Sequence, residues 1–203
     1  MASSMARPRD GTGPDTLLRA RGLSLDRGRG PLFANIDVDL TAGTAIRLIG
    51  ANGTGKTSLL RILAGLLPPN AGSVERHAPI GWVGHENALD PTRSVAANLA
   101  FWRPARDRHR PDPLGIEPLM TVPVRSLSQG QKRRVALTRL LNADKRVWLL
   151  DEPVVGLDDA SRDAFRTCLT THIGNGGAAI VATHGETWMA GAETLSLGGG
   201  QIA

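Results

Sequence analysis

Residues 50–57 read GANGTGKT and constrain the fold more than any other stretch of the chain. They fit the pattern G-x-x-x-x-G-K-[ST], in which a glycine-rich turn ends in a lysine and a hydroxyl residue. The apolar residues 44–50 predict a short buried strand before the motif, and residues 56–67 predict a helix after it, ended by Pro68 and Pro69. This setting favours a phosphate-binding loop over the alternative, a chance glycine-rich turn.

The residue types of the loop indicate its chemistry. Its glycines allow backbone N–H groups to turn toward a polyphosphate, and the N-terminus of the following helix favours negative charge. We expect Lys56 to reach the β and γ phosphates and the Thr57 hydroxyl to ligate Mg²⁺. The predicted nucleotide-binding residues are Gly50, Ala51, Asn52, Gly53, Thr54, Gly55, Lys56, Thr57 and Ser58.

Residues 147–153, VWLLDEP, place two carboxylates at the end of an apolar run. The run predicts a buried strand that projects Asp151 at its end, where the carboxylate can hold Mg²⁺ directly or through water. Glu152 is then expected beside the γ-phosphate, where it can orient or deprotonate the attacking water. The alternative is a pair of solvated carboxylates before a proline turn, which the nearby phosphate loop makes the weaker interpretation.

Two further stretches are compatible with the same ligand. Residues 127–131, LSQGQ, begin a predicted helix with Ser128 as its N-cap, and Gly130 in the first turn allows phosphate to approach the backbone. Taken alone, this stretch is an ordinary capped helix. A buried strand predicted at residues 178–184 ends at His184, which would point into the ligand crevice of an open α/β sheet. Taken alone, that histidine is more often structural.

The whole pattern predicts an α/β fold with a mostly parallel sheet covered on both faces, because apolar strands alternate with helices. Residues 17–25 and 32–40 flank a turn and predict two antiparallel strands at the start. Residues 1–15 are rich in Gly, Pro and Ser and are expected to be a disordered lead-in, with one domain over residues 16–203. A small helical insertion is expected at about residues 86–142.

Composition narrows the possible partners. No apolar run approaches the roughly 20 residues that span a bilayer, so any membrane role must come through a partner. The lone Cys168 rules out a disulfide framework within the chain and fits a reducing cytosol. The net charge of +5 would suit nucleic acid or anionic lipid. However, the chain has no tyrosine, and only Phe101 and Trp102 precede the arginine-rich residues 103–110, so we expect no nucleic-acid partner.

The order of these motifs resembles that of the ATP-binding-cassette ATPases, from about residue 17 to the end of the chain. The resemblance implies ATP and Mg²⁺ as ligands, a mostly parallel core sheet, an antiparallel β subdomain and a small helical subdomain. The implied motifs are a Walker A loop at residues 50–57, a signature at residues 127–131, a Walker B strand with Asp151 and catalytic Glu152, a D-loop at residues 156–158 with Asp158, and a switch histidine, His184. It also implies a head-to-tail homodimer, in which Ser128 and Gly130 of one subunit meet the ATP held by the other. One chain alone should therefore hydrolyse ATP poorly.

The sequence departs from that ATPase class at two places. Position 129 of the signature is Gln rather than Gly, which the first helical residue after a cap tolerates. The first hairpin carries LDRGRG where these ATPases usually offer a tyrosine to adenine. Either Arg27 or Arg29 lays a guanidinium over the base, or adenine is held loosely.

Three stretches, at residues 82–102, 123–141 and 148–158, resemble more closely the ATP-binding subunit of the cytochrome c maturation haem exporter. This resemblance implies a peripheral ATPase on the cytoplasmic face of the bacterial inner membrane, bound to integral membrane permease subunits. Its implied role is to energise haem handling or export during c-type cytochrome biogenesis. The alternative is the ATPase subunit of a different transporter, with a lipid, lipoprotein or peptide substrate.

The most discriminating part of that resemblance is Gly84 followed by His85, in residues 81–87, GWVGHEN. Cassette ATPases place a glutamine loop here that touches Mg²⁺ and the attacking water and links to the membrane partner. His85 takes the place of the glutamine, or Glu86 does if the loop is shifted by one residue. Because Mg²⁺ prefers oxygen ligands, we expect His85 to contact water or phosphate rather than the metal.

Overall fold

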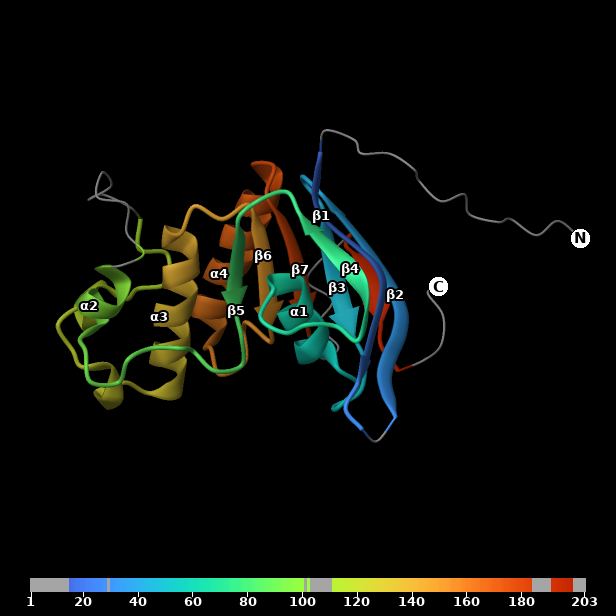
Figure 1. The fold of residues 1–203 in the computed structure, drawn as a ribbon. Coiled ribbons are helices and arrows are strands. Elements are labelled where there is room, and N and C mark those ends of the chain that lie inside the picture. The colour runs from blue at the N-terminus through green and yellow to red at the C-terminus, as the bar shows by residue number, and fades with distance from the viewer. Residues whose placement is uncertain (1–14, 29, 101, 103–110, 184–190, 199–203) are drawn as a thin grey trace, which may run out of the picture.

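The computed structural model describes residues 15–28, 30–100, 102, 111–183 and 191–198. Within these residues the chain forms two sheets and the helices that pack on them (Figure 1). The strands are β1 (Thr16–Asp26), β2 (Pro31–Thr41), β3 (Ala45–Ile49), β4 (Ala71–Arg76), β5 (Ile80–Val83), β6 (Val147–Asp151), β7 (Ala178–Ala182) and β8 (Glu193–Ser196). The helices are α1 (Lys56–Ala64), α2 (Val95–Ala100), α3 (Gln129–Asn142) and α4 (Asp159–Gly174), with the short 3-10 helices η1 (Glu117–Leu119) and η2 (Val124–Ser126).

The larger sheet has the strand order β5-β6-β7-β3-β8, and each neighbouring pair is parallel. Every residue of β6 and β7 is buried. Because alternate residues of a strand point to opposite faces, Val147 and Leu149 of β6 join the core that contains α1, whereas Trp148 and Leu150 join the core that contains α3 and α4. The predicted α/β fold, with a parallel sheet covered on both faces, is confirmed.

The smaller sheet has the order β2-β1-β4, and both of its pairings are antiparallel. It contains the two antiparallel strands predicted from residues 17–25 and 32–40. Its third strand, β4, has no counterpart in the sequence prediction, because its residues AGSVER are largely exposed and show no apolar alternation. Backbone pairing with β1 defines it instead, for example where Ala20 lies opposite Val74. The short edge strand β8, with one buried residue, likewise has no clear sequence signal.

The helix that follows the phosphate loop is shorter than predicted. It ends at Ala64 rather than at residue 67, because Gly65 takes a left-handed conformation with φ +80° and its N–H donates to the Ile62 carbonyl. The guanidinium of Arg76 on β4 donates to the carbonyls of Ile62 and Leu63, at 2.7 and 2.8 Å. A glycine cap and a cation beside the last carbonyls both stabilise a helix end, so this end lies ahead of the prolines.

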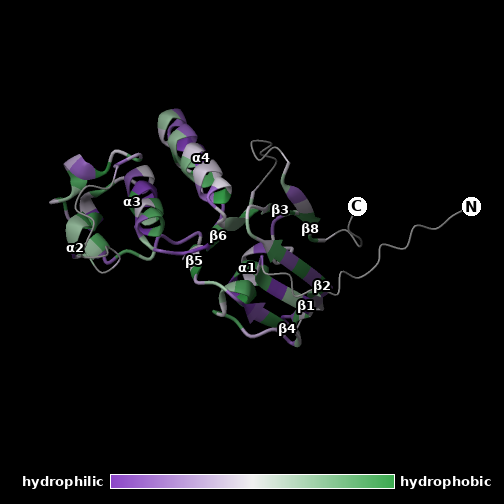
Figure 2. Ribbon diagram, turned by 90° about the horizontal axis from the view of Figure 1, so that it is seen from above, coloured by the Kyte–Doolittle hydropathy of each residue, from purple (hydrophilic) through white to green (hydrophobic). Residues whose placement is uncertain are grey.

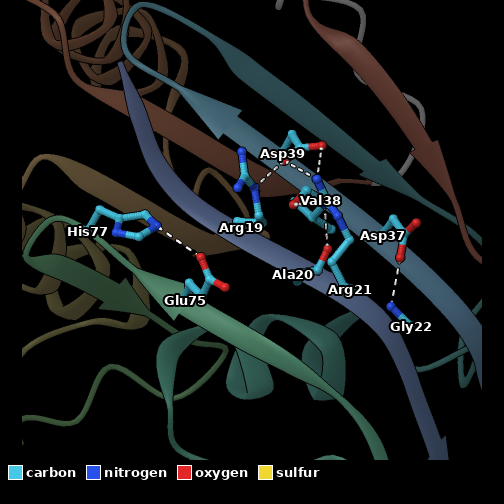
Figure 3. A network of polar contacts seen from close by, with 9 residues as sticks. All are labelled: Arg19, Ala20, Arg21, Gly22, Asp37, Val38, Asp39, Glu75 and His77. Atoms are coloured by element: carbon cyan, nitrogen blue, oxygen red, sulfur yellow. Dashed lines mark hydrogen bonds and ion pairs between the residues drawn. The ribbon is translucent and has the colours of Figure 1, made fainter. Parts of the chain in front are cut away.

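The smaller sheet carries a set of exposed polar contacts (Figure 3). Arg19 and Arg21 of β1 both contact the Asp39 carboxylate of β2, at 3.2 and 2.8 Å. The backbone N–H of Gly22 donates to the Asp37 carboxylate at 2.7 Å. Ion pairs at such a surface contribute about 0–1 kcal/mol each. Part of the arginine content of the chain therefore forms cross-strand pairs on a solvated sheet.

Helices α2 and α3 lie at the opposite end of the molecule from β1, β2 and β4 (Figure 1, Figure 2). Ahead of α2, the Ser94 hydroxyl accepts a hydrogen bond from the Ala97 N–H, and the helix buries Val95 and Leu99 in the core that also holds α3. In Figure 2 both helices carry hydrophilic as well as hydrophobic residues. No helix in the described part of the chain is long and apolar enough to cross a membrane.

Parallel pairing gathers the predicted motifs at one edge of the larger sheet. The carboxyl ends of β3, β5 and β6 lead into the phosphate loop, the loop with His85, and the turn with Glu152, respectively. The carboxyl end of β7 leads to Thr183, whose N–H donates to the Leu48 carbonyl of β3. In open α/β sheets, ligands bind outside this edge, so the fold places the motifs where a nucleotide is expected.

Candidate functional site

The phosphate loop connects β3 to α1 in a conformation that requires glycine. Gly50, Gly53 and Gly55 have φ values of +151°, +82° and +99°. A Cβ added to Gly55 would lie 2.9 Å from the Phe33 ring of β2, and one added to Gly50 would lie 2.5 Å from the Leu197 carbonyl oxygen. The smaller sheet therefore packs against the loop, and both glycines are fixed by space as well as by backbone conformation.

The ammonium of Lys56 closes the loop. Its Nζ donates to the carbonyl oxygens of Gly50 at 2.7 Å and of Ala51 at 3.1 Å, and the side chain is mostly buried. The Thr54 hydroxyl donates to the same Ala51 carbonyl at 2.9 Å. These contacts hold a positive charge at the mouth of the loop, where the resemblance places the β and γ phosphates.

The two predicted magnesium ligands meet in the structure. The Thr57 hydroxyl, in the first turn of α1, donates to the Asp151 carboxylate at the end of β6 over 2.7 Å, although 94 positions separate them in the sequence. Asp151 is 3% exposed. Mg²⁺ is usually held through one or two carboxylates together with substrate phosphates, so a hydroxyl and a carboxylate beside the phosphate loop fit this ion. Among the described residues, no three His, Cys, Asp or Glu side chains form a larger metal cluster.

Glu152 has an unusual backbone. Its φ is +49°, a left-handed conformation that non-glycine residues rarely adopt and that costs on the order of 1–3 kcal/mol. Its N–H donates to the Ala182 carbonyl of β7 at 3.0 Å, which anchors the turn to the neighbouring strand. Backbone strain of this kind persists where the surrounding structure holds it. Here the strained residue is the one whose carboxylate is expected to act in hydrolysis.

Arg133 on α3 is a site residue that the sequence analysis missed. Arg133 is 5% exposed, and its guanidinium lies among the chain segments that follow β5 and β6. The five bonds run from Nε to Pro153 O (2.9 Å), from Nη1 to Gly84 O (2.6 Å) and Asn87 Oδ1 (3.3 Å), and from Nη2 to Asp151 O (2.7 Å) and Glu152 O (2.8 Å). These bonds use every N–H that a guanidinium has.

The electrostatics of Arg133 follow from its position. Burial lowers its pKa to about 10, while the negative charges of Asp151 and Glu152 oppose that shift, so the group is protonated at neutral pH. The sequence does contain a signal for this residue. Position 133 shares a helix face with the buried residues Leu137 and Leu140, so a basic residue stands on an apolar face of the helix. A charge at such a position indicates buried acceptors.

The loop after β5 presents the predicted coupling residues. His85 and Glu86 are both exposed and follow the buried Gly84 at the carboxyl end of β5, which pairs with β6. A Cβ on Gly84 would lie 2.8 Å from the Trp82 ring, so this position favours glycine. Farther along, Ala88 has φ +49°, and its carbonyl accepts a hydrogen bond from Arg139 of α3 at 2.6 Å. Helix α3 thus holds the loop that carries His85.

The predicted signature begins α3 as a complete capping box. The Ser128 hydroxyl accepts from the Gln131 N–H, and the Gln131 side chain accepts from the Ser128 N–H at 2.8 Å. Gln129 is the exposed first helical residue, as expected. Asp158 caps α4 by accepting from the Ser161 N–H at 2.7 Å, and this hydrogen bonding lowers the pKa of Asp158.

These two helix starts border a hollow of about 300 Å³. Its lining residues are Ser128, Gly130, Gln131, Arg134, Gly156, Leu157, Asp158 and Ser161. None of residues 50–58 lines this hollow.

Two further predictions concern the γ-phosphate contact of His184 and the adenine contact of Arg27 or Arg29. His184 lies outside the described residues, as does Arg29, so their predicted roles stay predictions. Arg27, the other candidate for the adenine, donates from Nη2 to the Ser58 hydroxyl of α1 at 3.1 Å. The first hairpin thus reaches the helix that follows the phosphate loop.

Gly130 provides a test of how closely the signature packs on the D-loop. A Cβ at position 130 would lie 2.6 Å from the Gly156 carbonyl oxygen, which is backbone and cannot rotate away. Gly130→Ala should therefore destabilise the fold by about 1–3 kcal/mol, measured by thermal or denaturant unfolding. The control is Gly174→Ala at the end of α4, where an added Cβ meets nothing within 4 Å. Equal stability of the two variants would contradict the close contact between the signature and the D-loop.

Comparison with known proteins shows the family of the chain. The sequence profile of the ABC transporter family matches residues 33–155, more than half of the chain. The cytochrome c biogenesis ATP-binding export protein CcmA 2 of Cupriavidus metallidurans is 40% identical over 190 residues, covering 84% of this chain and 90% of that protein. The CcmA protein of Paracoccus denitrificans is 42% identical over 188 residues, covering 90% and 89%. The chain belongs to the ABC transporter family.

Within that family, its relatives place this ABC ATPase among the cytochrome c biogenesis ATP-binding export proteins. Solved structures agree on the fold. An ATP-binding subunit of an ABC transporter aligns with TM-score 0.77 at 19% identity, covering 90% of this chain and 86% of that chain. RNase-L Inhibitor aligns with TM-score 0.75 at 27% identity, covering 83% of this chain and 34% of that chain. The predicted family, fold class and ATP hydrolase activity are confirmed.

Proposed function

We propose that this ABC ATPase binds Mg²⁺-ATP at the carboxyl edge of its larger sheet and energises haem handling or export during c-type cytochrome biogenesis. The observation that carries the nucleotide site is the 2.7 Å bond between Thr57 and Asp151, which unites the Walker A and Walker B segments. The cytochrome c role is supported by the names of relatives about 40% identical over most of the chain.

Some of the site residues bind the nucleotide and Mg²⁺, and the others act on the attacking water and the γ-phosphate. Lys56 exchanges its loop carbonyls for the β and γ phosphates, and the loop N–H groups together with Ser58 at the start of α1 complete the cradle. Thr57 and Asp151 would hold Mg²⁺, which would supply positive charge against the negative charge that develops on the phosphates. Glu152 orients or deprotonates the attacking water, and His184 contacts the γ-phosphate. His85 follows the carboxyl end of β5, the strand that pairs with β6. From there it contacts the attacking water or the phosphate.

A second copy of the chain completes the site. The hollow beside Ser128, Gly130 and Asp158 presents a capped helix N-terminus, whose N–H groups favour an anion. Residues 50–58 of the same chain do not line this hollow, which supports a head-to-tail homodimer in which the hollow meets ATP held by the other subunit. This arrangement makes hydrolysis depend on dimer formation.

The membrane partner is an integral permease of the cytochrome c maturation system, with this subunit at the cytoplasmic face of the inner membrane. The exposed loop with His85 and Glu86 is the segment through which we expect that partner to act. It lies next to the short helix α2, and α3 holds it through Arg139.

Deletion of the gene tests the cytochrome c role. We expect the deletion strain to lose covalent haem on its c-type cytochromes, measured by haem staining and absorbance, with cytochromes of other types retained. Complementation with the wild-type chain should restore the haem, whereas complementation with Glu152→Gln should not. Normal maturation of c-type cytochromes in the deletion strain would instead point to a transporter of lipid, lipoprotein or peptide.

A further inference from the structure

A single guanidinium joins the turn that carries Glu152 to the loop that carries His85. Through Nε and Nη2, Arg133 binds the three successive carbonyls of residues 151–153, and through Nη1 it binds the Gly84 carbonyl and the Asn87 side chain. We propose that Arg133 is a positioning residue for ATP hydrolysis, which fixes the backbone that carries Glu152 and ties it to the loop that carries His85. The inference rests on the proposed role of Glu152.

The contacts of Arg133 determine the direction of the Glu152 side chain. Peptide groups are planar, so fixing the planes before and after a residue fixes its φ and ψ. The plane before Glu152 is held by the Asp151 carbonyl bond to Arg133 and by the Glu152 N–H bond to Ala182. The plane after it is held by the Glu152 carbonyl bond to Arg133. The left-handed conformation of Glu152, with φ +49°, is therefore imposed by its surroundings, largely by one side chain.

The same helix links this anchor to the surface that meets the second subunit. Ser128 and Gly130 line the hollow proposed to face the partner's ATP, and Arg133 lies on the next turn of the same helix α3. A helix moves as a rigid element, so a displacement of its capped end moves the guanidinium with it. Arg133 can thus pass a change at the dimer surface, or at the loop with His85, to the carboxylate that activates water.

Arg133→Lys tests the proposal in the full-length protein. Lysine keeps the positive charge, but three donors on one nitrogen cannot replace a planar fork that reaches five acceptors. We expect kcat for Mg²⁺-ATP to fall about 10- to 100-fold, the loss that follows from displacing a reacting group by about 1 Å. KM for ATP should stay within about twofold, because Arg133 binds the backbone carbonyl of Asp151 and not the carboxylate that meets Thr57.

The matched control is Arg166→Lys, the same chemical change on α4. Arg166 donates to the Asp163 carboxylate three residues earlier on that helix, at 2.9 Å, and belongs to neither the turn with Glu152 nor the loop with His85. Its kcat should stay near the wild-type value. Placing Arg133→Lys in a Glu152→Gln background should give no further loss of the residual rate, because both changes act on the same step.

The results separate the two hypotheses. If Glu152→Gln abolishes hydrolysis while Arg133→Lys keeps the wild-type kcat, the positioning role is wrong and the role of Glu152 stands. If Glu152→Gln hydrolyses ATP normally, the proposed function of that carboxylate fails first. A loss of ATP affinity and of kcat together in Arg133→Lys, with a lower unfolding temperature, would make Arg133 a structural residue and overturn the inference.

A measurement on the unaltered protein covers the case in which Arg133→Lys does not fold. Hydrogen–deuterium exchange is followed for peptides over residues 84–90 and 150–156, with and without Mg²⁺ and a non-hydrolysable ATP analogue. Because one guanidinium anchors both segments, they should gain protection together. Protection that rises in one segment and not in the other would overturn the link.

Discussion

Glu152→Gln should lower ATP hydrolysis about 100-fold or more, the usual contribution of a positioned general base. The amide has nearly the shape of the carboxylate but cannot accept the proton of the attacking water. Lys56, Thr57 and Asp151 are unchanged in this variant, so ATP should still bind. Phosphate release measures the rate, a fluorescent ATP analogue measures affinity, and size-exclusion chromatography with Mg²⁺-ATP should show a trapped dimer.

The control for this variant is Glu75→Gln, the same chemical change on β4, where the carboxylate is exposed and 3.4 Å from His77. Its hydrolysis rate should match that of the wild-type protein. Unchanged turnover in Glu152→Gln would remove Glu152 from the reaction, whereas loss of both ATP binding and turnover would mean that the substitution disturbs the strained turn rather than the chemistry.

Lys56→Ala should weaken ATP binding about 100-fold, because charge-assisted hydrogen bonds to two phosphates are lost together. The ammonium also binds the carbonyls of Gly50 and Ala51, so the loop loses its own closure in the same variant. Equilibrium titration with a fluorescent ATP analogue measures the effect, and circular dichroism checks that the fold persists.

Of the three lysines in the chain, Lys145 supplies the control, since it lies at the amino end of β6, whereas the phosphate loop lies at the carboxyl ends of the parallel strands. Lys145→Ala should bind ATP as the wild-type chain does. Tight ATP binding by Lys56→Ala would contradict the assignment of residues 50–57 as the phosphate loop.

Most of the fold was accessible to prediction because its signals are local. The apolar strands and helices of the larger sheet have clear periodicity, and the start of α3 carries its own capping box at Ser128 and Gln131. Prediction failed where pairing or capping comes from distant residues. Strand β4 has no pattern of its own, and α1 ends early because Arg76 and Gly65 hold its last turn.

The residues of the candidate site likewise divide into those with a local sequence signal and those whose role depends on distant residues. Lys56, Asp151 and Glu152 stand in contiguous motifs, so residue type and spacing identify them without any knowledge of their neighbours. Arg133 stands in the signature helix as one arginine among several, and its role depends on acceptors as far away in the chain as Gly84. A basic residue on an apolar stripe is a usable signal, but it does not reveal which carbonyls are bound.

By itself, the sequence determined the α/β class and the family, and it predicted the phosphate loop and the Walker B carboxylates, because each depends on short runs of residues whose type and order fix their chemistry. The tertiary structure decided that Thr57 meets Asp151, that Gly130 packs on Gly156, and that one guanidinium sets the backbone of Glu152. These contacts join segments far apart in the chain, and their geometry exists only after the parallel strands have aligned their carboxyl ends at one edge.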